Sequence, residues 1–373
     1  MSKLKSLTIR GFRSIEALES FEPGDICVLI GANGAGKSNF IEFFRMLRSM
    51  ADEAFQSYAQ KIGPEHLFFF GPKRTPKIEA RLEFGQNVYE FELAAKAGGG
   101  VLIHQERGQY TGGEGLGKLQ VLGGPDAESC LNRLKDQPPR SHLAVGGKGI
   151  PSHIYRAVSS WTVYHVHDTG PLSPVRGWSS VSNNVRLTHD AGNIASVLLD
   201  LRTSQPSDYF RIRDTIRLAA PFIDDFVLRP AKRGRDQQVS LEWTQRGSQE
   251  PFPPTVLSDG TIRFIALTTA LLQPDPPSTI VIDEPELGLH PAAIALLAET
   301  IRAASVNAQI VVGTQSALLL DRFEPHEVVV VERDNGKSNF RRLYESKLRD
   351  WLSDYSLGQL WLKNLLGGRP GRD

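Results

Sequence analysis

The stretch Gly31-Ala-Asn-Gly-Ala-Gly-Lys37-Ser38-Asn39 decides the fold of this chain of 373 residues. An apolar run at residues 26–30 precedes it and predicts a strand, and the apolar spacing after Ser38 predicts a helix. A strand before and a helix after are the context that the phosphate-loop pattern G-x-x-x-x-G-K-S requires. Glycines let such a loop close until backbone N–H groups point inward at a phosphate, and the helix N-terminus adds positive charge.

The side chains of the loop favour nucleotide binding over a chance glycine-rich turn. Lys37 supplies an ammonium for the phosphates, and Ser38 is placed to offer its hydroxyl to Mg²⁺. The other loop residues that we expect to bind the nucleotide are Gly31, Asn33, Gly34, Gly36 and Asn39. The sequence therefore predicts a protein that binds a nucleoside triphosphate.

The composition is that of an ordinary globular protein, with 40% hydrophobic and 23% charged residues. A net charge of +1 gives no overall field that would attract nucleic acid or an anionic membrane, so such binding needs a local patch. The two cysteines, Cys27 and Cys130, are too few for a disulfide framework or a thiolate metal site. No apolar run approaches the roughly 18 residues of a membrane span, and we expect no signal peptide, because the N-terminus has no apolar core long enough for one. We expect a cytoplasmic protein without a membrane partner.

The periodicity of apolar residues predicts a mixed α/β chain. Its first half is predicted to hold strands at 5–10 and 25–30, a helix from 38 extending toward 58, an antiparallel meander at 77–103, loops around one short helix near 131 in a glycine-rich insertion at 98–149, and a strand at 161–166. Its second half is predicted to hold helices at 191–218 broken at Pro206, two strands at 226–241 around a basic turn, helices at 258–272, 291–302 and 316–320, and strands at 279–282, 309–312, 327–332 and 339–343.

Two adjacent carboxylates, Asp283 and Glu284, follow the apolar run at 279–282. A carboxylate at the end of such a strand can provide a second contact to Mg²⁺, directly or through water. The next carboxylate can orient a water for attack on the γ-phosphate. An Asp-Glu pair after a strand is common by itself, but its place downstream of a phosphate loop favours this interpretation.

A second polar segment, Leu257-Ser258-Asp259-Gly260-Thr261, precedes an apolar helix. Ser258 is a good N-cap residue, and helix capping alone explains it without any ligand. The same hydroxyl and the free N–H groups also form an anion site, and Gly260 allows close backbone approach. Both interpretations stand on the residues alone.

Four motifs in the expected order resemble those of one superfamily. LSDGT resembles the signature motif of ABC-type ATPases, which lies just upstream of the acidic strand. The segment Asp283-Glu-Pro-Glu-Leu-Gly-Leu-His290-Pro291 resembles the magnesium-binding and dimer-contact segment of SMC/RecF-like heads and their stand-alone predicted-ATPase relatives, which are related to overcoming-lysogenisation-defect ATPases. Val312-Gly-Thr-Gln315-Ser matches the next strand end, and the opening Leu7-Thr-Ile-Arg-Gly-Phe-Arg13-Ser, with Asn39, resembles chromosome-maintenance heads more than transporter cassettes.

The resemblance implies an ABC/SMC-head-like P-loop NTPase fold, with a mixed sheet core, an antiparallel β subdomain and a helical lobe that carries the signature motif. It spans nearly the whole chain and is weakest from 98 to 160. We expect a single head over residues 1–373, whose sub-lobes are a phosphate-loop and antiparallel part at 1–96, a glycine-rich insertion at 97–160, a helical and β lobe at 161–256, the signature, acidic strand and switch at 257–345, and a helical tail at 346–373.

The resemblance also implies a homodimer that holds two ATP molecules with Mg²⁺ between its subunits. Lys37, Ser38, Asp283 and Glu284 would serve one nucleotide in their own subunit. Ser258 and Gly260 would serve the nucleotide of the partner. A γ-phosphate that bridges two subunits makes association conditional on ATP, and hydrolysis removes the bridge.

Two positions depart from the superfamily pattern. Gln315 stands where histidine is usual; its amide can hydrogen-bond the γ-phosphate but cannot become cationic. The loop that usually carries a magnesium-contacting glutamine reads His165-Val-His167-Asp168, so we expect His167 or Asp168 to take that role. A zinc pair at His165 and His167 is an alternative, but alternation along a strand explains the spacing more simply, and no third ligand is evident.

Three functions fit these motifs to different degrees. The first is a Mg²⁺-dependent ATPase whose ATP-clamped dimer acts in DNA repair or anti-phage defence and gates a separately encoded effector. The second is a dimerisation switch with negligible turnover, which only Gln315 supports. The third, a transporter cassette, is disfavoured. About thirty residues follow the last predicted strand, too few for a Toprim nuclease domain. The acidic segment Glu332-Arg-Asp334 falls in a predicted edge hairpin. We therefore expect no nuclease activity from this chain itself.

DNA is a further candidate partner. Two local basic groups could contact phosphates, although most such surface charges are simply solvated. The groups are Arg229, Lys232, Arg233 and Arg235, and Lys73, Arg74 and Lys77.

Overall fold

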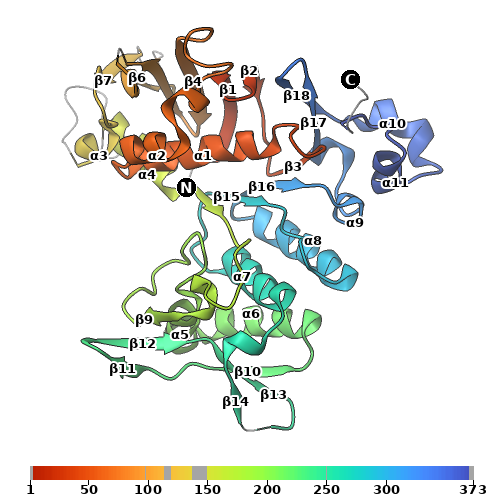
Figure 1. Ribbon diagram of the computed structural model, residues 1–373. Helices are drawn as coiled ribbons and strands as arrows, with labels where there is room; N and C mark the ends of the chain where they lie inside the picture. The colour runs from red at the N-terminus through yellow and green to blue at the C-terminus, as the bar shows by residue number, and fades with distance from the viewer. Residues whose placement is uncertain (1–2, 97, 113–118, 137–148, 249, 369–373) are drawn as a thin grey trace.

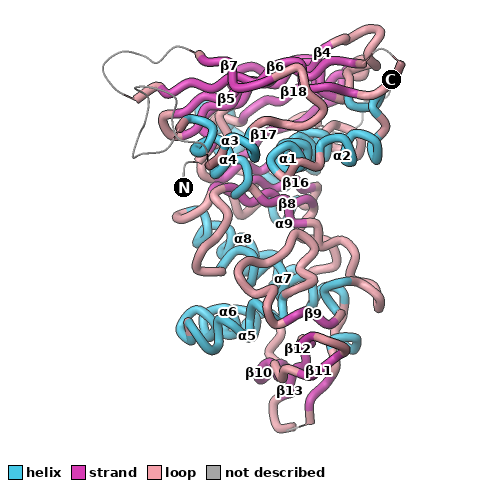
Figure 2. The backbone as a smooth tube through the Cα atoms, turned by 90° about the vertical axis from the view of Figure 1, so that its left-hand side faces the viewer, coloured by secondary structure: helices cyan, strands magenta, loops and turns pink. Residues whose placement is uncertain are grey.

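A computed structural model describes residues 3–96, 98–112, 119–136, 149–248 and 250–368. Its two six-stranded sheets lie in separate layers with helices between them, and a further helical lobe with small sheets lies on the other side of the second sheet (Figures 1 and 2). Within the described residues, no helix combines the length and the apolar character needed to cross a membrane.

The first sheet is antiparallel, with the strand order β2-β1-β4-β5-β6-β7. Its strands are β1 (Leu4–Phe12), β2 (Ile15–Phe21), β4 (Lys77–Phe84), β5 (Asn87–Ala95), β6 (Val101–Tyr110) and β7 (Gln120–Gly123). The predicted meander is confirmed. The sequence missed β2 because its buried residues Ile15, Leu18 and Phe21 are spaced by three, which follows from a shift in register between Leu7 and Ile9 of β1.

The prediction of loops throughout 98–149 is wrong where β6 and β7 extend this sheet. The alternation in β6 was hidden because two of its buried positions are not hydrophobic. Glu106 is buried and accepts hydrogen bonds from the Tyr89 hydroxyl at 2.5 Å and the Cys130 N–H at 2.8 Å. Gly108 leaves room for Ile150 and Ile154. The short helix near residue 131 is confirmed as α3 (Leu131–Leu134), whereas residues 113–118 and 137–148 of this tract lie outside the described residues.

The second sheet has the order β18-β17-β3-β16-β15-β8 and is parallel except for its edge strand β18. Its strands are β3 (Ile26–Ile30), β8 (Thr162–Tyr164), β15 (Thr279–Asp283), β16 (Gln309–Thr314), β17 (Val328–Asp334) and β18 (Lys337–Arg342). The carboxyl ends of five parallel strands therefore meet at one edge of the sheet. Ligand sites of open α/β sheets form at this edge.

Helices α1 (Lys37–Ala51), α2 (Phe55–Ile62), α3 and α4 (Ile150–Ser160) lie between the two sheets (Figure 2). Aromatic residues of α1 reach both ways, since Phe43 packs edge-on against Phe12 at 5.5 Å and Phe44 against Trp161 at 5.7 Å between ring centroids. The prediction of one helix continuing toward Tyr58 is wrong: α1 ends at Ala51, and Glu53 takes a positive φ of 54° that starts a new direction.

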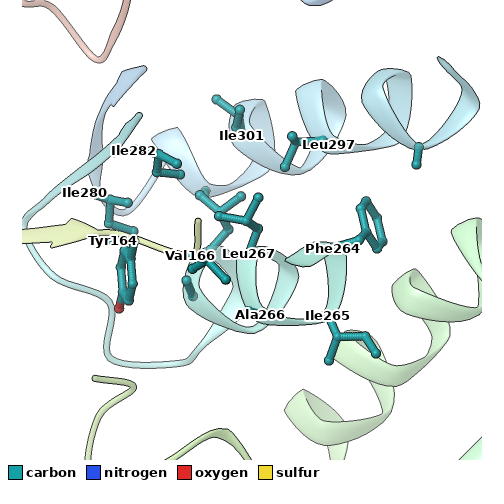
Figure 3. Close-up of a cluster of buried hydrophobic side chains, with 14 of the residues drawn as sticks. Tyr164, Val166, Phe264, Ile265, Ala266, Leu267, Ile280, Ile282, Leu297 and Ile301 are labelled. Carbon is teal, nitrogen blue, oxygen red and sulfur yellow. The ribbon is translucent and has the colours of Figure 1, made fainter. Parts of the chain in front are cut away.

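The other face of the mixed sheet is covered by α7 (Asp259–Leu272) and α8 (Pro291–Ser305). Figure 3 shows apolar residues of α7, such as Phe264 and Leu267, packed among side chains of β8, β15 and α8. Beyond them lie α5 (Ile194–Ser204) and α6 (Pro206–Ala219), which confirm the predicted break at Pro206. This packing places the start of α7 close to the carboxyl ends of β8 and β15.

Two small sheets complete the lower lobe. One contains β10 (Ile223–Val227), β13 (Glu242–Gln245) and β14 (Pro251–Phe252), and the other β9 (Trp178–Ser180), β11 (Ala231–Arg233) and β12 (Asp236–Ser240). The two strands predicted at 226–241 around a basic turn are confirmed as the β11–β12 hairpin, which turns at Gly234 and Arg235. The strand β10, which precedes the hairpin, was not predicted separately. The remaining predicted elements after residue 258 are confirmed, and the chain continues with α9 (Ala317–Leu320), α10 (Glu345–Leu352) and α11 (Leu357–Leu362).

Candidate active site

The phosphate loop connects the buried strand β3 to the N-terminus of α1. Gly36 has φ 114°, and a Cβ there would overlap the Ser338 side chain, so only glycine fits this turn. Behind the loop, the Ser338 hydroxyl donates to the Ala35 carbonyl at 2.6 Å and contacts the Ser14 hydroxyl at 2.7 Å. The Asn39 amide donates to that same Ser14 hydroxyl at 2.5 Å. Asn39 thus supports the loop from behind, while Asn33 and Gly34 lie exposed at its tip.

Lys37 links the loop to the acidic strand ends. Its side chain is 5% exposed, and its Nζ donates to the carbonyls of Gly31 at 2.6 Å and Ala32 at 3.1 Å. Burial lowers the pKa of Lys37, and the nearby carboxylates of Glu284 and Asp283 oppose that change. The cation predicted from the loop therefore lies within electrostatic reach of both predicted carboxylates.

The structure brings together Ser38 and Asp283, two of the residues that we expect to contact Mg²⁺. The Ser38 hydroxyl donates to Asp283 Oδ2 at 3.0 Å, across two segments that are far apart in the chain. Asp283 Oδ1 is buried and has no hydrogen-bond partner among the described residues. Burial raises the pKa of Asp283, and the neighbouring Glu284 carboxylate adds to this rise. A hydroxyl beside an unpartnered carboxylate oxygen suits a hard cation such as Mg²⁺, so the residues present fit the metal that the loop implies.

Glu284 begins the segment after β15 in a strained conformation. Its φ is 43°, which is uncommon for a residue with a side chain, and its N–H donates to the Gly313 carbonyl at 2.7 Å. Its carboxylate accepts a hydrogen bond from the Gln315 amide. The two residues predicted to act on the γ-phosphate are therefore in direct contact, at adjacent strand ends.

Glu286 is a member of this site that the sequence did not single out. Its carboxylate accepts from the Thr314 hydroxyl at 2.5 Å and from the Gln315 N–H at 3.3 Å. Burial raises the pKa of Glu286, and the bond from Thr314 opposes the rise. Glu286 thereby fixes the strand end that presents Gln315. The signal in the sequence was a third carboxylate two residues after Glu284, but its partner lies on another strand.

Contacts within the same chain cap the N-terminus of α7 and hold it in place. Ser258 caps the helix as predicted, accepting from the Thr261 N–H at 3.1 Å, and it is exposed. We expected Gly260 to allow a ligand close to the backbone. In the structure it allows the Gly288 carbonyl of the same chain to come close, because a Cβ on Gly260 would overlap that carbonyl. The buried Arg176 holds this segment, donating to the Leu257 carbonyl and the Asp259 carboxylate, each at 2.9 Å.

Arg263, on α7, joins three functional segments. It donates to the Val166 carbonyl at 2.8 Å, to the His167 carbonyl at 3.2 Å and to the Leu287 carbonyl. Its side chain therefore ties the start of α7 to the loop after β8 and to the segment after Glu284. The apolar pattern of the helix gave no indication of this role, because Arg263 appears in the sequence as one charge before a hydrophobic run.

The structure separates the two candidates in the loop after β8. His167 lies near enough to Asp283 to lower its pKa, whereas Asp168 is exposed and accepts from the Gly170 N–H at 3.2 Å. The rings of His165 and His167 are 4.6 Å apart between centroids. Among the described residues, no group of three or more His, Cys, Asp or Glu side chains could hold a metal ion, so nothing supports the zinc alternative there.

A cavity of about 540 Å³ opens beside the phosphate loop. It lies between the loop, the β17–β18 turn and the segment before β4. Its lining includes Ser14, Asn39, His66, Phe69, Phe70 and Arg333. The sequence gave no indication of this cavity, because its aromatic residues lie in an irregular segment without periodic pattern.

The sequence model of one protein family, described as "AAA domain, putative AbiEii toxin, Type IV TA system", matches residues 26–112 and 131–321. The chain belongs to this family. The match to this AAA-domain family contains the phosphate loop, the start of α7 and the strand ends with Asp283, Glu284 and Gln315. A comparison with curated proteins finds no match.

Solved structures of SMC heads share the fold of this AAA-domain protein. The SMC head bound to the C-terminal winged-helix domain of ScpA has 15% sequence identity and a TM-score of 0.54, over 93% of this chain and 99% of that one. The SMC head with an extended coiled coil, bound to the C-terminal domain of ScpA from Pyrococcus furiosus, has 14% identity and a TM-score of 0.55, over 95% and 99%. The chain therefore has the ABC/SMC-head-like P-loop NTPase fold expected from its motifs.

Proposed function

We propose that this protein binds ATP with Mg²⁺ and hydrolyses it. The observation that carries the proposal is the pairing of Ser38 with Asp283 beside an unpartnered carboxylate oxygen, next to the buried Lys37. Ser38 and Asp283 would hold Mg²⁺, which when bound neutralises charge on the phosphate oxygens. His167 lies close enough to contribute there through water.

Each remaining side chain has a task that its surroundings support. Lys37 and the N–H groups of the loop bind the phosphates. The Glu284 carboxylate orients the attacking water in line with the γ-phosphate, and the Gln315 amide holds that carboxylate or the phosphate itself. The cavity lined by His66, Phe69 and Phe70 is the place we assign to the nucleobase, since aromatic rings offer it stacking partners.

We further propose that two copies enclose the nucleotides between them. The tip of the phosphate loop, Ser258 and the segment near Gly288 are all exposed, so each is accessible to a second copy. Ser258 would then face the phosphates bound by the partner, using the free N–H groups at the start of α7.

The biological setting we propose is DNA repair or anti-phage defence, with a separately encoded effector. The description of the AAA-domain family names a putative toxin of a type IV toxin–antitoxin system, and the similar SMC heads were solved with ScpA domains. Both descriptions favour a partnership with another protein.

DNA is a second partner that we propose, and the exposed basic group at the β11–β12 hairpin is the surface that would bind it. Within the described part of the chain, none of these residues forms an ion pair: Arg229, Lys232, Arg233 and Arg235. The second group is less available, because Lys77 pairs with Glu92 at 2.6 Å.

A single-turnover ATP hydrolysis assay tests the proposed function. The Glu284→Gln variant is expected to bind Mg²⁺–ATP as the wild type does but to hydrolyse it about 10²–10⁴-fold more slowly, because the water loses its base. Lys37→Ala is expected to lose affinity for the nucleotide. Wild-type protein that does not bind ATP would contradict the proposal.

The second candidate function is an ATP-dependent dimerisation switch with negligible turnover. One contact favours it: the Gln315 amide donates a hydrogen bond to the Glu284 carboxylate, which is then less free to act on a water. A switch would bind ATP and dimerise, but wild type and Glu284→Gln would then hydrolyse ATP at equal, very low rates. The same assay therefore separates the two candidates.

A further inference from the structure

The end of the described chain contacts the phosphate loop directly. The Ala32 N–H donates to the Gly368 carbonyl at 2.8 Å. This N–H belongs to the Gly31–Ala32 peptide, whose carbonyl, on Gly31, accepts from Lys37 Nζ at 2.6 Å. Because a peptide unit is planar, fixing its N–H also fixes the direction of its carbonyl. The contact from Gly368 therefore sets the orientation of an acceptor for Lys37.

Residues 366–368, which we term the C-terminal strap, are anchored on the sheet beside the loop. The Gly368 N–H donates to Glu332 Oε1 at 2.6 Å, and Arg341 Nη2 donates to the Leu366 carbonyl at 2.6 Å. Glu332 is on β17, which pairs with β3, and Arg341 is on the edge strand β18, which pairs with β17 (Figure 1). The sequence predicted only that Glu332 lies in a hairpin. These contacts show that its carboxylate holds the strap.

The backbone of the strap requires glycine. Gly367 and Gly368 have φ 77° and 78°. A Cβ on Gly368 would lie 2.8 Å from Val330 Cγ1 and 3.0 Å from the Trp361 ring, and a Cβ on Gly367 would overlap the Glu332 carboxylate. Any other residue at either position would push the strap away from the loop.

The helix that leads into the strap, α11, packs on α9, which follows Gln315. Gly358 of α11 donates its N–H to Asp321 at 2.5 Å and lies so close to the Ala317 carbonyl that a Cβ would overlap it. Ala317 begins α9, two residues after Gln315. Residues 357–368 therefore contact both the helix after Gln315 and the loop that holds Lys37.

We propose that the C-terminal strap is a positioning element of the nucleotide site: Gly368 fixes the Gly31–Ala32 peptide and thereby the phosphate loop. This inference rests on the proposed function, because it concerns how the same loop binds phosphate. It adds that nucleotide affinity depends on residues at the far end of the chain, and that α11 connects this support to the segment behind Gln315.

The test compares two ways of releasing the strap, in the full chain, by titration calorimetry with Mg²⁺–ATP and with ADP. Gly368→Ala strains the strap directly, and Glu332→Ala removes its anchor without changing its backbone. Each is expected to weaken both affinities by roughly three- to tenfold, the range for loss of one supporting hydrogen bond. The titrations use the Glu284→Gln background, so that ATP is not consumed.

Two matched controls separate positioning from general destabilisation. Gly247→Ala introduces the same strain at φ 83°, where no described residue apart from its chain neighbours lies within 4 Å of the added Cβ, and is expected to leave the affinities unchanged. Glu332→Gln keeps an acceptor for the Gly368 N–H and is expected to restore affinity. Wild-type affinity in both Gly368→Ala and Glu332→Ala, or an equal loss in Gly247→Ala, would overturn the inference alone. Absence of nucleotide binding in the wild type would overturn the proposed function and this inference with it.

Discussion

Asp283 and Glu284 are neighbours in the chain but have different surroundings, and on the proposed function this gives them different tasks. Asp283 is held by Ser38 and keeps one buried oxygen unpartnered. Glu284 turns away through its positive φ and reaches Gln315 instead. Two carboxylates in different environments can take the roles of metal ligand and base in one site.

The Asp283→Asn variant tests this separation. Its amide oxygen can still accept the bond from Ser38, but the site loses the charge that a cation needs. We expect nucleotide affinity in the presence of Mg²⁺ to fall about tenfold, equivalent to about 1.4 kcal/mol. Affinity measured with a chelator is expected to equal that of the wild type. A loss of equal size under both conditions would contradict the role as metal ligand.

His165 is expected to remain neutral well below neutral pH. Partial burial lowers its pKa to about 4, and the Arg45 guanidinium, 3.2 Å from its Nδ1, adds to this effect. The unfolded chain protonates this ring near pH 6.5, so its contribution to stability is lost as pH falls from about 6.5 to about 4. An NMR titration of the His165 ring gives the pKa, and Arg45→Met should raise it. Titration of His165 near pH 6.5 in the wild type would show that this environment is wrong.

At the residue scale, the sequence predicted those members of the site that lie in local motifs. Lys37, Ser38, Asp283 and Glu284 each follow a strand or begin a helix, so spacing alone located them. Glu286 and Arg263 could not be found in this way. Their tasks depend on Thr314 and on the carbonyls of Val166 and Leu287, which only the folded chain brings near.

At the scale of elements, α7 connects the site to the rest of the molecule. Its apolar residues pack on β8, β15 and α8 (Figure 3), while Ser258 caps its N-terminus and Arg263 is its fifth residue. The apolar core therefore holds the body of the helix, and the three backbone carbonyls that accept from Arg263 hold its start. A change at Arg263 should affect both folding and the site.

We expect Arg263→Met to lower the free energy of unfolding by about 1.5–3 kcal/mol, the range for hydrogen bonds that involve a charged group. Methionine keeps much of the apolar stem but cannot donate to the three carbonyls. Urea denaturation measures the change, with Arg263→Lys as a partial replacement of intermediate stability. Wild-type stability in Arg263→Met would show that these contacts contribute nothing.

The elements that the sequence missed share one physical cause. In β2 a shift in register changed the spacing of buried residues from two to three, and in β6 a buried carboxylate and a glycine replaced hydrophobic residues. Both strands are stabilised by neighbours that are distant in the chain. Strands such as β3 and β15, which contain uninterrupted runs of buried hydrophobic residues, were predicted within one residue.

At the scale of the whole molecule, the layers place every functional segment at one edge of the mixed sheet. β3, β8, β15 and β16 end there, α7 starts close to it, and the C-terminal strap returns to it. The motif order predicted this fold, which the SMC heads share. The strap could not be predicted, because two glycines near the end of a chain carry no periodic signal.

Our central proposal is that ATP joins two copies of the chain through the start of α7. Sedimentation velocity of Glu284→Gln tests this directly, compared with the same variant carrying Ser258→Asp. Aspartate keeps the N-cap of α7, so the fold is retained, but its charge repels a partner's phosphate. We predict a monomer with ADP, a dimer with Mg²⁺–ATP, and a monomer under both conditions for the double variant. A chain that stays monomeric with Mg²⁺–ATP at high protein concentration would contradict the account.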